Sequence, residues 1–273
     1  MTKSQKTAKK SIKRKNENIV SMTVLIICVI FLLLPLFVII LFSFNESKQG
    51  SFTNFSLRWY KELFFDSPQL FQALENSLFI AFTAGSVATI FGTLGAIGTG
   101  LNREKSHTFI NLTTFLPLVL PDVIVGIALV LFFSKISINL NLFTIFIAHT
   151  TFCIPFVYLT VKARMESFDF SISEVARDLG ATERQALTKI IIPMIAPSIY
   201  SGFILAITMS LEDFIITFFV SGPGSTTLPL YIFSLIRFGI TPVINAMCFF
   251  IILSLTICVF TMKRFVKNFA HSR

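Results

Sequence analysis

Charged residues are scarce in this sequence: they make up 14% of its 273 residues, whereas 54% are hydrophobic. Soluble domains carry about 25% charged residues, so this composition, with a mean hydropathy of +0.79, excludes an ordinary water-soluble domain. Histidine is also rare, with three residues scattered along the chain. Such scattering offers no convincing nucleophile–base pair or metal cluster, which argues against a membrane enzyme.

Cysteine and nucleotide-binding motifs are equally sparse. The four cysteines (Cys28, Cys153, Cys248 and Cys258) lie inside apolar runs and lack CxxC or Cys/His spacing, which argues against disulfide and zinc roles. No GxxxxGK[ST] phosphate loop is present, because Leu101 follows Gly95 and Gly100, the pair with the right separation. The chain therefore cannot hydrolyse ATP by that route, and we expect it to bind no cofactor of its own.

Six apolar runs are long enough to cross a bilayer, which takes about 20 residues of helix. They are Ile19–Phe42, Ser77–Thr99, Phe109–Phe133, Leu142–Val161, Ile199–Val220 and Val243–Met262. The first run is too long for a cleaved signal peptide and is followed by no small-residue cleavage site, so we interpret it as a retained span. The predicted fold class is an all-α membrane protein with six transmembrane helices.

Basic residues between these runs predict the orientation. With alternating sides, most of the 23 Lys and Arg residues fall on one face, and residues 1–18 alone hold seven. We therefore expect both termini, 1–18 and 263–273, in the cytoplasm. The net charge of +9 then reflects membrane topology or contact with anionic lipid, not nucleic-acid binding.

Two connections are long. The external one, 43–76, carries Trp59 and Tyr60 for the membrane interface, and Ser67-Pro68 predicts a helix start. The core, residues 77–262, contains the cytoplasmic loop 162–198. Small residues in the second span predict close helix packing; they are Ala81, Gly85, Ala88, Gly92, Gly95 and Gly98.

The loop 162–198 predicts two short helices joined at a glycine. Ser171 to Glu174 fits a capping box, and one apolar face follows at helical spacing. That face comprises Ile172, Val175, Ala176 and Leu179. Gly180 is expected to end the helix in a left-handed conformation. Thr182 begins a second capping box, and we expect its helix to stop at Pro193.

This loop resembles the "EAA" segment of ABC importer permeases, Glu-Ala-Ala, three residues, Gly, nine residues, Ile-x-Leu-Pro. The chain has Glu174, Ala176, Gly180, Ile190 and Pro193 at matching positions, with Val175 and Ile192 as apolar departures. The resemblance implies a type I importer permease fold. It also implies that Glu174–Pro193 is the coupling segment held in a groove of a cytoplasmic ATPase.

Three carboxylates interrupt the apolar runs: Asp122 at the midpoint of the third, and Glu212 and Asp213 in the fifth. Each costs roughly 2.5–3.5 kcal/mol at a bilayer centre, so we expect them to face a bundle interior or a wet cavity. Because no Lys or Arg lies in any span, an ion pair within the chain is not expected. A cationic ligand between aromatic walls, with Phe214 and Phe218 as candidates, is the remaining explanation.

Other interpretations of these residues stay open. The Asp122 carboxylate could hydrogen-bond to backbone groups at a helix end, since Pro121 frees such groups nearby. Of the neighbours Glu212 and Asp213, only one could point inward. His149 is either a proton relay or, as we prefer, a hydrogen-bonded core residue.

Further runs resemble the spermidine/putrescine permeases of this family. They are Leu116-Pro117, Pro121-Asp122, His149–Phe156, Arg177–Ala181, Ser210–Asp213, Ser221–Gly224 and Leu228–Leu230. The departures are the basic tail and Glu212, where the family pattern has Asp. The resemblance implies a polyamine substrate, a homologous permease subunit, an ATPase dimer carrying ATP and Mg²⁺, and an external substrate-binding protein.

Two transport alternatives remain. The chain could be an ABC permease for another small solute. It could also be a secondary transporter in which Asp122, Glu212 and Asp213 bind a coupling proton or sodium ion, although no inverted repeat is evident.

Overall fold

The computed structural model describes residues 3–48, 51–101, 114–167, 169, 171–238 and 242–271, and these fold into helices with one isolated β-bridge. The chain divides into two compact units. The first comprises Met1–Ser67 and Phe238–Arg273, and the second comprises Pro68–Arg237.

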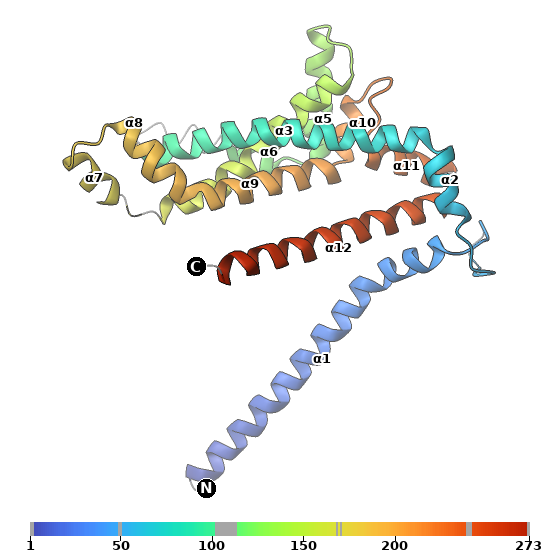
Figure 1. Cartoon of the computed structure of the whole chain (residues 1–273), viewed down its shortest axis with the longest axis horizontal. Coiled ribbons are helices and arrows are strands. Elements are labelled where there is room, and N and C mark those ends of the chain that lie inside the picture. The colour runs from blue at the N-terminus through green and yellow to red at the C-terminus, as the bar shows by residue number, and fades with distance from the viewer. Residues whose placement is uncertain are drawn as a thin grey trace. The chain divides into compact units, whose positions relative to one another are not determined.

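The first unit contains α1 (Lys3–Ser43), α2 (Arg58–Asp66) and α12 (Pro242–His271) (Figure 1). The apolar stretch from residue 20 to residue 38 is exposed along its length, as expected for a helix surrounded by lipid or by another chain. Beyond it, Trp59 is fully buried, and its indole N–H donates to the carbonyl of Asn45. The Asn45 side chain in turn accepts from the Thr53 N–H (2.9 Å), which closes the loop between α1 and α2.

The second unit is built on α3 (Pro68–Leu101), α6 (Leu142–Glu166) and α9 (Ile192–Glu212), which lie side by side (Figure 1). The predicted start at Pro68 is confirmed. Small residues of α3 permit the packing: a Cβ on Gly92 would lie 2.8 Å from Val157 of α6, and one on Gly85 would lie 3.1 Å from Ile207 of α9. The expectation of close packing is confirmed at these two positions, whereas Gly98 faces open space.

Shorter helices complete one end of this unit: α5 (Asp122–Lys135), α10 (Ile215–Val220) and α11 (Leu228–Phe238). α5 packs on α10, and a Cβ on Gly126 would meet Phe219. The loop before α11 is tied to α3, because the Asn76 amide donates to the Thr226 carbonyl (2.9 Å). This end of the unit holds the cavity described below.

At the other end, α7 (Ser171–Asp178) and α8 (Glu183–Ala186) form the predicted pair of short helices. The prediction that Pro193 stops the second helix is wrong. A π-helical turn, Leu187–Ile191, joins α8 to α9, and the helical run continues through Pro193 to Glu212. A proline removes one i→i−4 hydrogen bond and crowds the preceding turn, and the wider π-turn just before it accommodates both effects.

Four described helices are long and apolar enough to span a membrane: Val20–Ser43, Pro68–Leu101, Leu142–Glu166 and Glu183–Glu212. They contain or overlap the first, second, fourth and fifth predicted runs. Val243–Met262 lies within α12. The total of six spans and the cytoplasmic placement of both termini stay predictions.

Two predicted spans are not single helices. In Phe109–Phe133, of which 109–113 lie outside the described residues, a helical stretch at 114–119 ends before Pro121 and α5 begins at Asp122. Asp122 therefore starts a helix and does not lie in the middle of one. The run Ile199–Val220 is also interrupted, between Glu212 and Ile215. Pro121 explains the first break because proline cannot donate a backbone hydrogen bond. The carboxylate of Asp213 stabilises the second break by accepting hydrogen bonds from the backbone of α10.

Candidate functional site

A cavity of about 420 Å³ lies at the two helix breaks of the second unit, within the size range of small-molecule sites. It brings together four of the five predicted substrate-path residues, Asp122, Glu212, Asp213 and Phe214. No lysine or arginine is among the described residues that line it. The cavity therefore concentrates negative charge without a basic side chain to neutralise it.

Asp122 and Glu212 present the accessible charge of this cavity. Both residues are exposed, and neither carboxylate forms a hydrogen bond or ion pair with a described residue. Asp122 is the first residue of α5, where the positive end of the helix dipole lies. Its place at a helix end agrees with the alternative interpretation, although its side chain caps no described backbone group.

Asp213 lies in a different environment, although it also lines the cavity. Its side chain is only 8% exposed, and its oxygens accept from the N–H groups of Ile216 (3.2 Å) and Thr217 (2.8 Å) at the start of α10. The Thr217 hydroxyl adds a third hydrogen bond (2.8 Å). The carboxylate thus satisfies the backbone groups that the break between α9 and α10 exposes.

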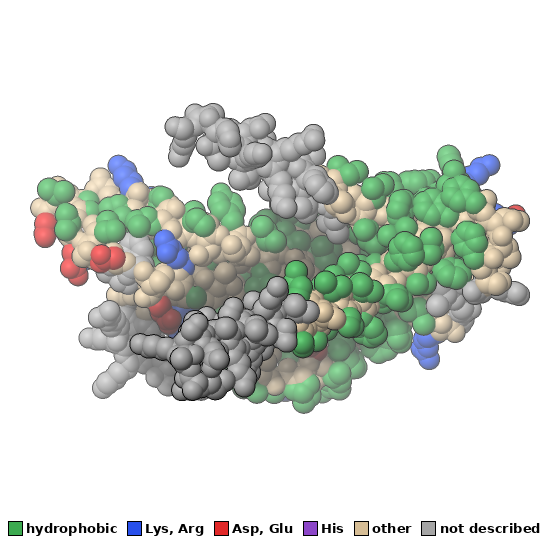
Figure 2. Space-filling view, turned by 90° about the horizontal axis from the view of Figure 1, so that it is seen from below, with side chains coloured by type: hydrophobic (Ala, Val, Ile, Leu, Met, Phe, Trp, Pro, Cys, Tyr) green, Lys and Arg blue, Asp and Glu red, His purple; other side chains and the backbone are tan. Residues whose placement is uncertain are grey.

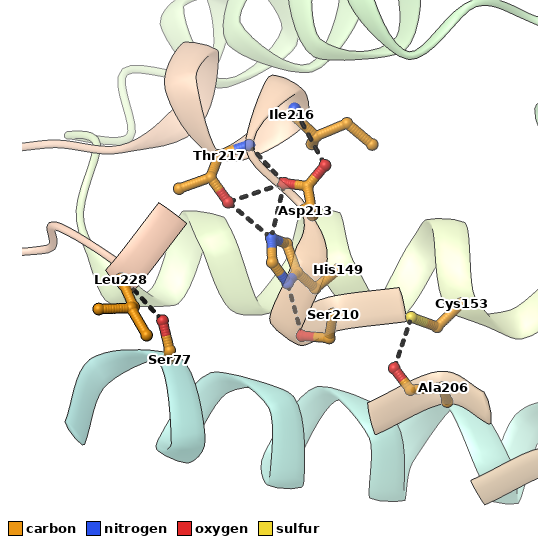
Figure 3. A network of polar contacts seen from close by, with 9 residues as sticks. All are labelled: Ser77, His149, Cys153, Ala206, Ser210, Asp213, Ile216, Thr217 and Leu228. Atoms are coloured by element: carbon orange, nitrogen blue, oxygen red, sulfur yellow. Dashed lines mark hydrogen bonds and ion pairs between the residues drawn. The ribbon is translucent and has the colours of Figure 1, made fainter. Parts of the chain in front are cut away.

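His149 is the partner of Asp213 that the sequence reasoning overlooked. Its Nε2 lies 3.3 Å from Asp213 Oδ2 and 2.9 Å from Thr217 Oγ1, and its Nδ1 lies 2.7 Å from Ser210 Oγ (Figure 3). The expectation of no ion pair within the chain considered only lysine and arginine, and it overlooked that a histidine of α6 comes within 3.3 Å of this carboxylate. The interpretation of His149 as a hydrogen-bonded core residue is confirmed, since it is 1% exposed.

Aromatic side chains surround part of the cavity. Phe214 lines it, and its ring centroid lies 4.5 Å from that of Phe233 on α11. Phe218 packs against Phe214 at 5.8 Å but is absent from the lining and is 49% exposed. Sequence reasoning missed Phe152 and Phe156 of α6, which also line the cavity. Their spacing of three and seven residues from His149 places all three on one helix face.

The predicted coupling segment lies away from the cavity, at the far end of α9 (Figure 1). The apolar side chains of α7 and of Leu179, the residue directly after it, are solvent-exposed, with Ile172 at 42%, Val175 at 57% and Leu179 at 85%. Figure 2 shows acidic and basic side chains beside them, at the left of the view. Glu174 and Ala176 belong to this helix. An apolar helix face left exposed in this way has no partner among the described residues.

The turn after α7 explains the motif glycine. Gly180 has φ +90°, its N–H donates to the Arg177 carbonyl (2.9 Å), and the N–H of Ala181 donates to the Ala176 carbonyl (3.0 Å). These two bonds form a Schellman motif, in which the left-handed residue is usually glycine. The expectations for Gly180 and for the Thr182–Gln185 capping box are confirmed. Ile190 lies in the π-turn and Pro193 in the first turn of α9.

The first capping box differs from expectation. Ser171 is the first residue of α7 and not its N-cap, and its N–H donates to the carboxylate of Asp169 (3.0 Å). Hydrogen bonds from Ser171 hold the pKa of Asp169 below its ordinary value. An acidic residue before the helix therefore supplies the capping acceptor.

Comparison with known proteins identifies relatives over most of the chain. The family described as binding-protein-dependent transport system inner membrane component matches residues 88–272. The spermidine/putrescine transport system permease protein PotC of Haemophilus influenzae is 38% identical over 240 residues, which cover 87% of this chain and 93% of that protein. The putrescine transport system permease protein PotI of Escherichia coli is 40% identical over 225 residues, 80% of each chain.

A solved structure supports the fold. It is a crystal structure of a bacterial ABC transporter involved in the import of the acidic polysaccharide alginate. One of its chains matches with a TM-score of 0.72 at 18% identity, covering 92% of this chain and 97% of that one. At this identity the match concerns the fold alone.

Proposed function

The chain belongs to the family of binding-protein-dependent transport system inner membrane components, and we propose that it is the permease subunit of an ATP-driven importer of polyamines. It is a multi-pass protein of the plasma membrane and a transporter component, not an enzyme. The substrate proposal rests on the relatives that are 38% and 40% identical, whose names specify spermidine and putrescine, or putrescine alone.

The cavity has the chemistry that such a cargo requires. A polyamine carries several ammonium groups on an apolar chain. The carboxylates of Asp122 and Glu212 suit the ammonium groups, and the rings of Phe152, Phe156 and Phe214 suit the methylene segments. A cavity whose described walls are acidic and aromatic, with no lysine or arginine among them, disfavours an anionic cargo. Which polyamine is preferred depends also on the external binding protein that delivers it.

The coupling segment supports the proposal that a separate ATPase supplies the energy. The exposed apolar face formed by Ile172 and Val175 of α7 and by Leu179 directly after it fits a groove on a cytoplasmic ATPase subunit. We propose that an ATPase dimer, carrying ATP and Mg²⁺, binds this segment and the equivalent segment of a homologous permease subunit.

One helical run connects the α7–α8 hairpin to the cavity. Glu183–Glu212 spans 30 residues, roughly 45 Å at the α-helical rise, and ends at the cavity. A displacement of the α7–α8 hairpin by the ATPase would therefore act on Glu212 through a continuous helix. This link provides a physical route from ATP binding to alternating exposure of the cavity.

The test is uptake of labelled spermidine and putrescine by the complex reconstituted in proteoliposomes with its partner permease, ATPase and binding protein. Asp122→Asn and Glu212→Gln each remove one charge-assisted hydrogen bond of about 1.5–3 kcal/mol, so each should raise KM by roughly 10–100-fold. Glu75→Gln, an exposed carboxylate of α3 outside the cavity, is the matched control and should leave KM unchanged. Unaltered KM in both cavity variants would refute the role of these carboxylates.

The energy source is tested in the same vesicles. Dissipating ion gradients at constant ATP should leave uptake intact, and withdrawing ATP should abolish it. The reverse result would favour the ion-coupled secondary transporter.

A further inference from the structure

One side chain of α6, His149, contacts both sides of the break between α9 and α10. His149 contacts Ser210 in the last turn of α9, and on the other side of the break it contacts Asp213 and Thr217 (Figure 3). All of these polar side chains except that of Asp213 belong to fully buried residues. His149 therefore couples a third helix to both halves of the interrupted one.

The hydrogen bonds determine which nitrogen of His149 carries a proton. An ionised carboxylate only accepts, so the Thr217 hydroxyl uses its hydrogen on Asp213 Oδ2 (2.8 Å). The Thr217 oxygen can then only accept from His149, which requires an N–H at Nε2 (2.9 Å). The same N–H faces Asp213 Oδ2 at 3.3 Å. His149 is thus a donor directed at the carboxylate and hydroxyl that begin α10.

Asp213 has little acceptor capacity left for a ligand. Its Oδ2 atom receives the Thr217 N–H, the Thr217 hydroxyl and the His149 Nε2, while Oδ1 receives the Ile216 N–H. A carboxylate offers about four acceptor sites. Asp122 and Glu212, by contrast, are exposed and make no such bonds with described residues. The three cavity carboxylates therefore differ in their remaining capacity to accept hydrogen bonds from a ligand.

We propose that His149 is a positioning residue for cargo binding: it fixes Asp213 at the break between α9 and α10, which leaves Asp122 and Glu212 to meet the cationic cargo. This inference rests on the proposed import of polyamines. Glu212 is the residue just before the break and Phe214 the residue just after Asp213, so the geometry of the break sets where both side chains enter the cavity. Loss of the donor at His149 would displace them together.

The test compares two amide substitutions in the reconstituted complex. The amide nitrogen of His149→Gln can reach the position of Nε2, whereas that of His149→Asn reaches only the position of Nδ1. We expect the KM for spermidine to stay within about twofold of wild type with Gln and to rise roughly tenfold or more with Asn. Thr151→Ala is the control and should not change KM, because Thr151 is exposed on α6 and its hydroxyl bonds the Ile147 carbonyl and no other described residue.

Thr217→Val provides a second, nearly isosteric variant that removes the hydroxyl between His149 and Asp213, and it should raise KM in the same direction. A double-mutant cycle then separates positioning from direct cargo contact. If Asp213 acts through the break, His149→Asn combined with Asp213→Asn should match the more severe single variant within about twofold. If the rise in KM of the double variant instead equals the product of the rises in the two single variants, the inference is overturned.

The outcomes distinguish this inference from the proposed function. A wild-type complex that imports neither spermidine nor putrescine refutes the function itself. Wild-type uptake with equal KM values in the Gln and Asn variants of His149 refutes only the positioning role, because the Nε2 donor would then have no influence on cargo binding.

Discussion

Replacing Gly180 tests the coupling segment by backbone strain alone. Gly180 has φ +90°, and a Cβ built on it would meet no atom within 4 Å, so the substitution introduces no steric overlap. An alanine in a left-handed conformation costs about 1–2 kcal/mol. That cost lowers the equilibrium constant for the native α7–α8 turn by about 5–30-fold. Asparagine, which tolerates this conformation better, should have a smaller effect.

The assay measures ATP hydrolysis and spermidine uptake together in proteoliposomes. We expect uptake per ATP to fall in the order Gly, Asn, Ala at position 180, with little change in the thermal midpoint of the complex because the turn lies at an exposed end. Gly98→Ala is the matched control, since it also meets open space but lies inside α3, where alanine favours the helix. Wild-type coupling in Gly180→Ala would contradict the argument that this turn transmits ATPase motion.

Two further predictions concern stability, measured as the thermal unfolding midpoint of the purified chain in detergent. Gly222→Ala would drive a Cβ into the Leu140 carbonyl and should lower the free energy of unfolding by about 3 kcal/mol or more. Gly224→Ala meets open space at φ +76° and should lower it by only about 1–2 kcal/mol. Equal unfolding midpoints of the two variants would refute the close contact at Gly222. Trp59→Phe removes the donor to the Asn45 carbonyl in a fully buried position and should cost about 1–3 kcal/mol, and an unchanged midpoint would show that this bond does not hold the loop.

Local sequence chemistry was sufficient to predict two turns of the segment 174–193. A glycine directly after an apolar helical face predicts a left-handed helix end, and Thr182 followed by Gln185 predicts a capping box; both lie where expected. The same reasoning failed at Pro193, because a π-turn that ends two residues earlier absorbed the disruption that proline causes. Such compensation arises from the register of the whole helix and is not visible in a short motif.

The candidate site was only partly predictable. The cost of burying a carboxylate in an apolar run indicated Asp122, Glu212 and Asp213, and the cavity does bring them together. The packing of Phe233 against Phe214 was not predictable, since α11 reaches Phe214 only after the chain has turned through the Ser221–Leu228 loop. Nothing in the linear spacing brings these two rings together.

The amino-acid sequence by itself determined the membrane class, the positions of the apolar runs and the Gly180 turn, because hydropathy, capping and glycine geometry act over a few residues. Only the tertiary structure decided how the three carboxylates differ. His149 and Asp213 lie 64 positions apart in the chain, yet α6 places the imidazole 3.3 Å from the carboxylate at the break between α9 and α10. A hydrogen bond depends on the separation of two atoms in space, and helix packing sets that separation.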